Sequence, residues 1–235
     1  MKNRILSAFF TLLAGWAIAA DPDLKSEVTT GAQKLKQEGN YSWKSSIEFG
    51  NFTGGTEGKI DKEGLIGLAM SFGDNKTEAF LKNGKGAVKT QDEDWQSLSE
   101  LATAAGTEPG PKMFLVRRLQ TFKAPAEEAV DLAGKTKEIK KDGEAYSGEL
   151  TETGAKELLS FGGRNRSNFP EPKNAKGTVK FWLKNGTLSK YQLNLQGTMN
   201  FNGEDRDIDR TTKYEIKDVG TTKVEVPDPA RKKLS

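Results

Sequence analysis

The feature that most constrains the fold is a pair of alternating segments around an Asn-Gly turn, in the stretch VKFWLKNGTLSKYQLNLQG at positions 179–197. Both central residues of a type I′ turn need a positive φ, which Asn185 and Gly186 tolerate, so the stretch predicts a β-hairpin. The odd-numbered positions of the hairpin share one apolar face: Val179, Phe181, Leu183, Tyr191, Leu193 and Leu195. An apolar face of this size has to be covered by another part of the chain.

The same alternation recurs along most of the chain. Short runs separated by Gly, Asn or Asp occupy positions 41–49, 52–60, 65–72, 76–82, 86–90, 136–141 and 144–150. This spacing predicts a meander of antiparallel strands. The last two strands are expected at 211–217 and 222–226, and they end before Pro227 because proline cannot continue a central strand.

Apolar residues at helical spacing predict five helices. The expected helices cover positions 24–38, 95–105, 113–122, 125–133 and 151–163. The first has an aspartate cap at Asp21 or Asp23 and stops at Gly39. The three helices between 95 and 133 separate two groups of strands, so we expect them to cover the apolar face of the sheet.

The first twenty residues form a segment of their own. Lys2 and Arg4 precede an apolar run, and Ala17-Ile18-Ala19 offers the small residues that a signal peptidase requires. We therefore expect a secretory signal peptide at 1–20, with a retained N-terminal anchor as the alternative. Residues 21–235 contain no Pro/Ser-rich linker and no repeat of fixed period, so a single domain is expected.

The chain has no cysteine and no histidine. It therefore has no disulfide, no cysteine for lipid modification, no Ser-His-Asp triad and no zinc site built from His or Cys. An exported chain without disulfides is typical of a bacterial periplasm, so we expect a periplasmic or secreted protein.

Charge and acidic residues give no sign of nucleic acid or metal. The chain has 36 Lys and Arg against 33 Asp and Glu, interspersed along its length without a basic patch. The series Asp205, Asp207 and Asp209 lacks the glycine and the glutamate of a calcium-binding loop. We expect no nucleic-acid partner, no metal and no cofactor.

The order of elements resembles the periplasmic lipoprotein-carrier superfamily, the LolA-like and LppX-like half-barrels. The similarity lies in this order and in stretches such as AYSGELTETGAKELL and TVKFWLKNGTLSKYQLNLQG. It implies an α+β fold in which a curved antiparallel sheet forms an incomplete β-barrel, covered on its concave side by helices. Several members hold acyl chains there. Many relatives are themselves lipoproteins, whereas this chain has no cysteine to acylate.

Nine large apolar residues are the candidate lining of such a cavity: Ile47, Phe49, Met70, Phe72, Trp95, Phe181, Leu183, Leu193 and Leu195. With the resemblance, they predict binding of a lipid, an acylated protein or another amphipathic ligand, with peripheral contact to a membrane. A packed core is the alternative for the same residues. Two arginine pairs, at 117–118 and at 164 and 166, either hold an anionic head group or lie solvated on the surface.

Three functions are compatible with the sequence. A binding or carrier protein needs only the apolar faces. An envelope hydrolase would need two carboxylates of unequal pKa, which the sequence alone cannot select. A structural or interaction domain would fill its interior with its own side chains. No catalytic motif is present, and we therefore expect a protein that is not an enzyme.

The leader gives the first testable prediction. Expression of the full chain in a bacterial exporter should yield a mature protein that starts after Ala19 or Ala20, as measured by intact-mass spectrometry. Recovery of a chain that still begins at Met1, in the membrane fraction, would contradict the signal-peptide interpretation.

Overall fold

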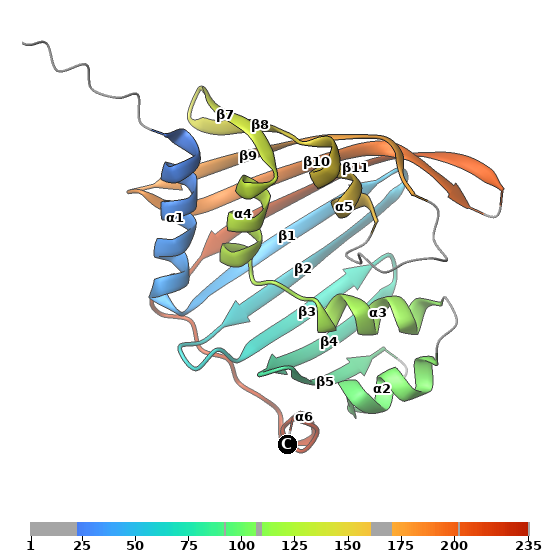
Figure 1. The fold of residues 1–235 in the computed structure, drawn as a ribbon. Coiled ribbons are helices and arrows are strands. Elements are labelled where there is room, and N and C mark those ends of the chain that lie inside the picture. The colour runs from blue at the N-terminus through green and yellow to red at the C-terminus, as the bar shows by residue number, and fades with distance from the viewer. Residues whose placement is uncertain (1–22, 92, 107–109, 161–170, 202, 235) are drawn as a thin grey trace, which may run out of the picture.

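The structure is a computed structural model that describes residues 23–91, 93–106, 110–160, 171–201 and 203–234 (Figure 1). The expected signal peptide at 1–20 lies outside the described residues, as do Arg164 and Arg166. None of the helices in the described ranges combines the length and apolar character needed to span a bilayer.

Strands dominate the described part of the chain, and helices interrupt them. The strands are β1 (Tyr41–Phe49), β2 (Phe52–Ile60), β3 (Ile66–Phe72), β4 (Asn75–Lys82), β5 (Lys85–Thr90), β6 (Gln96–Ser97), β7 (Thr136–Asp142), β8 (Ala145–Leu150), β9 (Lys173–Lys184), β10 (Thr187–Phe201) and β11 (Glu204–Lys217). The helices are α1 (Leu24–Glu38), α2 (Leu98–Ala105), α3 (Pro111–Gln120), α4 (Pro125–Gly134), α5 (Glu152–Leu159) and α6 (Asp228–Arg231).

All eleven strands belong to one antiparallel sheet, in the order β6-β5-β4-β3-β2-β1-β11-β10-β9-β8-β7. The sheet does not close into a barrel, since β6 and β7 are its two edges. Strands β1 and β11 meet at its centre, where Trp43 pairs with Ile216 on one side and with Gly58 on the other. The expected α+β class with a large antiparallel sheet is therefore confirmed.

The predicted Asn-Gly hairpin is confirmed. Asn185 and Gly186 join β9 to β10 with φ values of 53° and 72°, as a type I′ turn requires. The apolar face of this hairpin is buried as the alternation predicts, because Phe181, Tyr191 and Leu195 are each 0% exposed. Strand β9 is longer than expected, because it begins at Lys173 and not at Val179.

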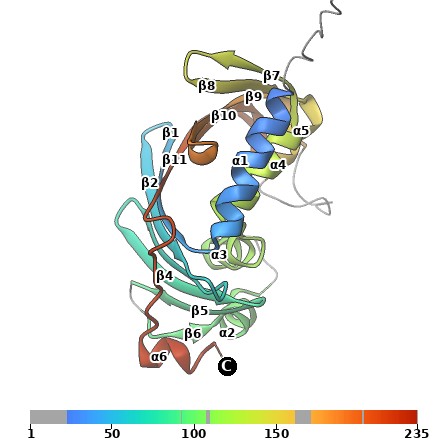
Figure 2. The ribbon, with the colours of Figure 1, turned by 90° about the vertical axis from the view of Figure 1, so that its left-hand side faces the viewer.

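Figure 2 shows α1, α3 and α4 together on one side of the curved sheet. We call this the helix-side face; it includes Trp43, whose ring is stacked 6.2 Å from that of Phe122 in the α3–α4 connection. Helix α1 contacts β10, β9 and α4, and α5 contacts β9 and β10. The sequence predicted that the helices between 95 and 133 cover the apolar face of the sheet. In the structure, the helix with the most extensive contact with β10 is α1.

The prediction of a strand at 222–226 is wrong. Strand β11 takes the position beside β1, so the following residues find no free edge there and cross the other face of the sheet. Asn40 fixes the start of this segment: its side chain donates to the Thr222 carbonyl at 3.0 Å, and its carbonyl accepts from Gly220 at 2.9 Å. Lys233 fixes the end through Glu100 of α2, at 2.9 Å.

The helix expected to begin at Trp95 begins three residues later. Ser97 is its N-cap and forms a capping box with Glu100: the Ser97 hydroxyl accepts from the Glu100 N–H at 3.1 Å, and the Glu100 carboxylate accepts from the Ser97 N–H. This pair satisfies two of the free donors of the first turn. The capping signal therefore outweighs the apolar spacing that included Trp95.

A glycine beneath a tryptophan lets the sheet and the helices approach each other. A Cβ added at Gly58 would lie 2.0 Å from Cζ2 of Trp43, so the indole lies directly over the backbone of β2. Trp43 is 3% exposed and contacts Phe122 on its other side. The layer from β2 to the α3–α4 connection thus depends on the absence of a side chain at position 58.

Replacement of this glycine should destabilise the fold. Gly58→Ala forces the indole of Trp43 to move within a packed layer, at an expected cost of about 1–3 kcal/mol in the free energy of unfolding. Gly134→Ala is the control, because a Cβ there meets nothing within 4 Å; it should be neutral or stabilising. Urea unfolding followed by circular dichroism measures both, and equal midpoints would contradict the packing described here.

Candidate functional site

The structure separates the nine candidate lining residues into groups. Phe181, Leu193 and Leu195 are at most 5% exposed and belong to the packed core. Leu183 lies beneath α1, because its Cδ2 atom is 2.7 Å from the position of a Cβ added at Gly31. These four residues pack within the core or beneath α1.

Trp95 lies apart from the other candidates, on the opposite face of the sheet. Its ring is 5.5 Å from that of Phe80. Phe80 follows Ala79, which pairs with Leu68 on the helix-side face, so alternation places Phe80 on the other side. Phe80 and Val224 of the C-terminal segment lie on either side of Gly67. Trp95 is therefore part of the packing under that segment.

The remaining four candidates come together at the end of the helix-side face where the β1–β2 and β3–β4 turns lie. With Phe52 they form a surface that we call the apolar platform: Ile47, Phe49, Phe52, Met70 and Phe72. The rings of Phe52 and Phe72 stack at 5.8 Å and 13°, and they remain 58% and 46% exposed. The other three side chains are half-buried. Within the described ranges, the platform is therefore the part of this face with the most exposed aromatic side chains.

Gly54 makes the platform continuous. A Cβ added there would lie 3.0 Å from Cδ2 of Phe72 and 3.2 Å from Cγ2 of Ile47, so the two side chains approach each other over the bare backbone of β2. Gly54 pairs with Ile47 in β1 and with Phe72 in β3. The three strands thus present one apolar surface instead of separate side chains.

A row of hydroxyl groups crosses the helix-side face beside the platform. Cross-strand pairing places Thr56, Ser45, Tyr214 and Tyr191 next to one another on β2, β1, β11 and β10. The rings of the two tyrosines stack at 4.4 Å. Buried hydroxyls need hydrogen-bond partners. Ser45 donates to the Thr56 carbonyl within the sheet, at 3.5 Å, whereas the two tyrosines need a partner from the helices.

Glu128 of α4 meets this row. Its carboxylate accepts a hydrogen bond from the Tyr191 hydroxyl at 2.6 Å, and Tyr214 also hydrogen-bonds to it. Burial raises the pKa of Glu128, while the two tyrosines and the charges of Arg210 and Arg118 partly offset this effect. The pKa values of Tyr191 and Tyr214 are also raised, first by burial and then by the nearby charge of Glu128.

Two arginines border the platform. Arg210 of β11 pairs with Phe49 and donates to the Leu158 carbonyl of α5 at 3.4 Å, and burial lowers the pKa of its guanidinium. Arg118 of α3 is exposed, and its Nη2 lies 3.5 Å from the hydroxyl of Thr56. Since Thr56 pairs with Met70, Arg118 lies at the platform's other border.

All four tyrosines of the chain bond to helices through their hydroxyls. Tyr146 donates to Glu27 of α1 at 2.5 Å, and Tyr41 accepts from the N–H of Ala126 at 3.3 Å. Burial raises the pKa of Tyr41 to about 12. The tyrosine hydroxyls therefore fix α1 and α4 at defined positions over the strands.

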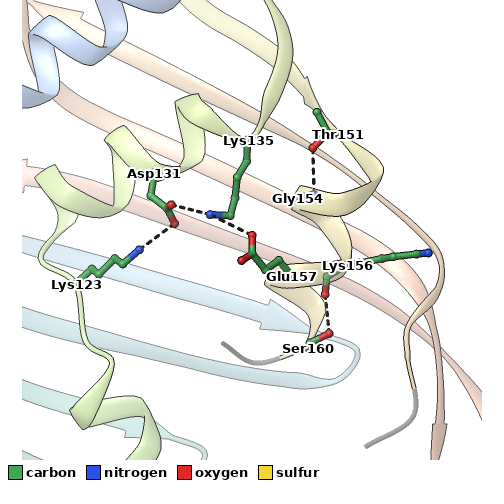
Figure 3. Close-up of polar contacts among 8 residues, drawn as sticks. All are labelled: Lys123, Asp131, Lys135, Thr151, Gly154, Lys156, Glu157 and Ser160. Atoms are coloured by element: carbon green, nitrogen blue, oxygen red, sulfur yellow. Dashed lines mark hydrogen bonds and ion pairs between the residues drawn. The ribbon is translucent and has the colours of Figure 1, made fainter. Parts of the chain in front are cut away.

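Ion pairs fix the far end of α4, as Figure 3 shows. Asp131 accepts from Lys135 at 2.6 Å and from Lys123 at 3.1 Å, and Lys135 also contacts Glu157 of α5 at 3.5 Å. Burial alone would raise the pKa of Asp131, but the hydrogen bonds from the two lysines outweigh it and lower the pKa. Helix α4 is thereby tied to α5, which limits how far Glu128 can move.

The groups at this site can hold charge and bind apolar surface. Glu128 is surrounded by two tyrosines and two arginines, none of which is a usual nucleophile at neutral pH. Within the described ranges, no three acidic residues come close enough to hold a metal ion. Asp205, Asp207 and Asp209 lie exposed on β11 and accept hydrogen bonds from β10 side chains instead.

Comparison with protein-family models finds no match for this chain, and comparison with curated proteins finds none either. The resemblance to the lipoprotein-carrier superfamily therefore stays a prediction from the order of elements.

Sequence reasoning did not single out Glu128, Tyr214 or Arg210. A signal for Glu128 was present, because it lies three residues after Pro125 and four before Leu132, on the buried stripe of α4. A carboxylate in such a stripe needs a partner from the element it faces. The partners come from strands more than sixty residues later, which no local pattern indicates.

Glu128 should make the stability of the fold depend on pH in a defined direction. A carboxyl whose pKa is raised on folding contributes stability that is complete below its unfolded pKa, near 4.5, and that is lost as pH rises through the folded value. The free energy of unfolding of the wild type should therefore fall relative to Glu128→Gln as the pH is raised above about 4.5.

Urea unfolding at several pH values measures this difference, and a tenfold change in proton affinity corresponds to about 1.4 kcal/mol. Glu127→Gln is the matched control, because Glu127 is exposed and paired with Lys36 at 2.7 Å; it should not remove the wild-type trend. Parallel curves for the wild type and Glu128→Gln would show that burial does not raise the pKa of this carboxyl.

Proposed function

We propose that the protein binds an amphipathic molecule, a lipid or an acylated protein, with the apolar part of the ligand on the apolar platform. The observation that carries this proposal is the difference in exposure between two parts of one sheet face, strands β9 and β10 on one side and strands β2 and β3 on the other. Phe181 and Leu195 are fully buried under helices, whereas Phe52 and Phe72 are about half exposed. Clustered exposed apolar side chains mark binding surfaces.

We infer further that the sheet forms an incomplete barrel whose concave side is covered by helices. The curvature of the sheet in Figure 2, and the contacts of α1 and α5 with β9 and β10, support this arrangement. The cover would then be partial, because the platform lies on the same face. An apolar ligand could enter there without unfolding the packed half of the protein.

The leader at 1–20 supports a place outside the cytoplasm, in a periplasm or in the medium, for this binding. There, the mature protein would carry its ligand between membrane surfaces or hold it near one. No cofactor is needed for this function.

A carboxylate hydrolase has less support. Such an enzyme needs two carboxyl groups on either side of the scissile bond, about 5–10 Å apart. The charges acting on Glu128 come chiefly from Arg210 and Arg118, and its hydrogen-bond partners are tyrosines. This surrounding favours a structural or binding role for Glu128 over that of a paired catalytic acid.

Two measurements test the proposed function. Protein exported with its own leader should co-purify with lipid, detected by native mass spectrometry and by extraction. After delipidation, it should bind the neutral fluorescent probe N-phenyl-1-naphthylamine saturably. The double variant Phe52→Ser/Phe72→Ser should weaken probe binding about tenfold or more, because each aromatic ring contributes on the order of 1 kcal/mol of apolar contact.

Val219→Ser is the matched control, since Val219 is another exposed apolar side chain, 40% exposed, and lies outside the platform. Both variants change exposed residues and should keep the wild-type unfolding midpoint. A charged substitution such as Leu183→Arg does not test ligand binding, because Leu183 packs against α1 and the change would disturb the fold. The absence of both co-purified lipid and saturable probe binding would favour a structural domain.

A further inference from the structure

The platform is bordered by positive charge on two sides. Arg210 pairs with Phe49 in the neighbouring strand, and Arg118 reaches over Thr56, the cross-strand partner of Met70. Platform residues therefore lie beside both arginines. An extended ligand on the platform would have one end within reach of a guanidinium.

The two guanidiniums lie in one electrostatic environment. Arg118 and Arg210 each act on Glu128 and on Tyr214, and Arg118 lowers the pKa of Arg210 through repulsion. Like charges brought together in a partly buried place favour binding of an anion. Glu128 opposes this effect when it is ionised, and burial favours its neutral form.

Arg118 has the freedom to bind a ligand. It is exposed, and its contact with the Thr56 hydroxyl, at 3.5 Å, is at the limit of a hydrogen bond. No carboxylate in the described part of the chain forms an ion pair with it. Its guanidinium can offer two parallel N–H donors to a carboxylate or a phosphate.

We propose that the ligand of the platform is an anionic amphiphile, whose carboxylate or phosphate head is bound by Arg118 with electrostatic support from Arg210. This inference rests on the proposed function and specifies its ligand class. The apolar chain lies over Met70, Phe72 and Phe52, and the head lies beside the guanidinium of Arg118, near its contact with Thr56 of β2.

The test compares three ligands with the same ten-carbon chain and different heads: decanoate, decyl phosphate and 1-decanol. Each displaces N-phenyl-1-naphthylamine from delipidated protein, below its micelle concentration. Arg118→Gln should weaken decanoate and decyl phosphate about tenfold, or about 1.4 kcal/mol, and leave 1-decanol within twofold. Arg118→Lys, which keeps the charge and loses the planar fork, should lie between them.

Arg117→Gln is the matched control, because it removes the same charge from the adjacent position of α3. It should leave all three affinities within twofold. If Arg118→Gln and Arg117→Gln lose the same affinity for the anionic ligands, the effect is one of long-range charge, and the proposal is wrong. An equal loss for all three ligands in Arg118→Gln would overturn it as well, since the arginine would then act through shape alone.

Two further arms separate this inference from the proposed function. Acetate and inorganic phosphate supply the head without the chain, and they should not bind at concentrations where decanoate saturates the protein. If either binds as tightly as decanoate, the proposal that the ligand is an amphiphile is wrong. If 1-decanol and the neutral probe bind while the anions bind no better, the inference fails and the proposed function stands. If neither the probe nor any of the ligands binds, both fail.

Discussion

The hydrogen bonds between Glu128 and the tyrosines of β10 and β11 determine how the helices lie on the sheet. A carboxylate and two phenols placed in a partly buried layer are costly unless they meet one another, so only one position of α4 satisfies all three. Tyr146 and Tyr41 impose similar conditions on α1 and on the start of α4. Apolar packing supplies most of the stabilisation of such a layer, but it allows a helix to shift over the sheet. Hydrogen bonds to the tyrosine hydroxyls are directional, and they fix the helix in one position.

The strands could be predicted from the sequence to a large extent, because alternation and turn dipeptides are local signals. The Asn185–Gly186 hairpin and the burial of Phe181 and Leu195 agree with the prediction. The prediction of a strand at 222–226 was wrong, because β11 occupies the place beside β1 in the sheet. The local pattern of residues does not show which of two segments pairs with β1. The candidate site was found only in part for the same reason: alternation gives the face of Ile47 or Phe181, whereas the helices decide which of them is covered.

The helix-side face therefore has two parts with different properties. The part formed by β9 and β10 contacts α1 and α5, and there the large side chains at 181, 183, 193 and 195 pack in or against the core. In the other part, glycine at position 54 joins the side chains of three strands into one apolar surface, with a guanidinium at either border. Core and surface share one strand pattern, which explains why the sequence could not distinguish them. The two parts differ in the strands that form them, because Leu193 and Leu195 of β10 lie in the same cross-strand rows as Ile47 and Phe49 of β1.

The central pairing of β1 with β11 has a consequence for the order in which the chain can fold. The Ser42 hydroxyl donates a hydrogen bond to Asp218, 176 residues later. The second edge of β1 can therefore pair only after almost the whole chain has been made. Contacts of such long sequence separation form slowly. Until then, the two meanders are separate units with open edges and without a common core. A chain with this topology therefore keeps the inner edges of β1 and β10 unpaired until β11, the last strand of the sheet, is available.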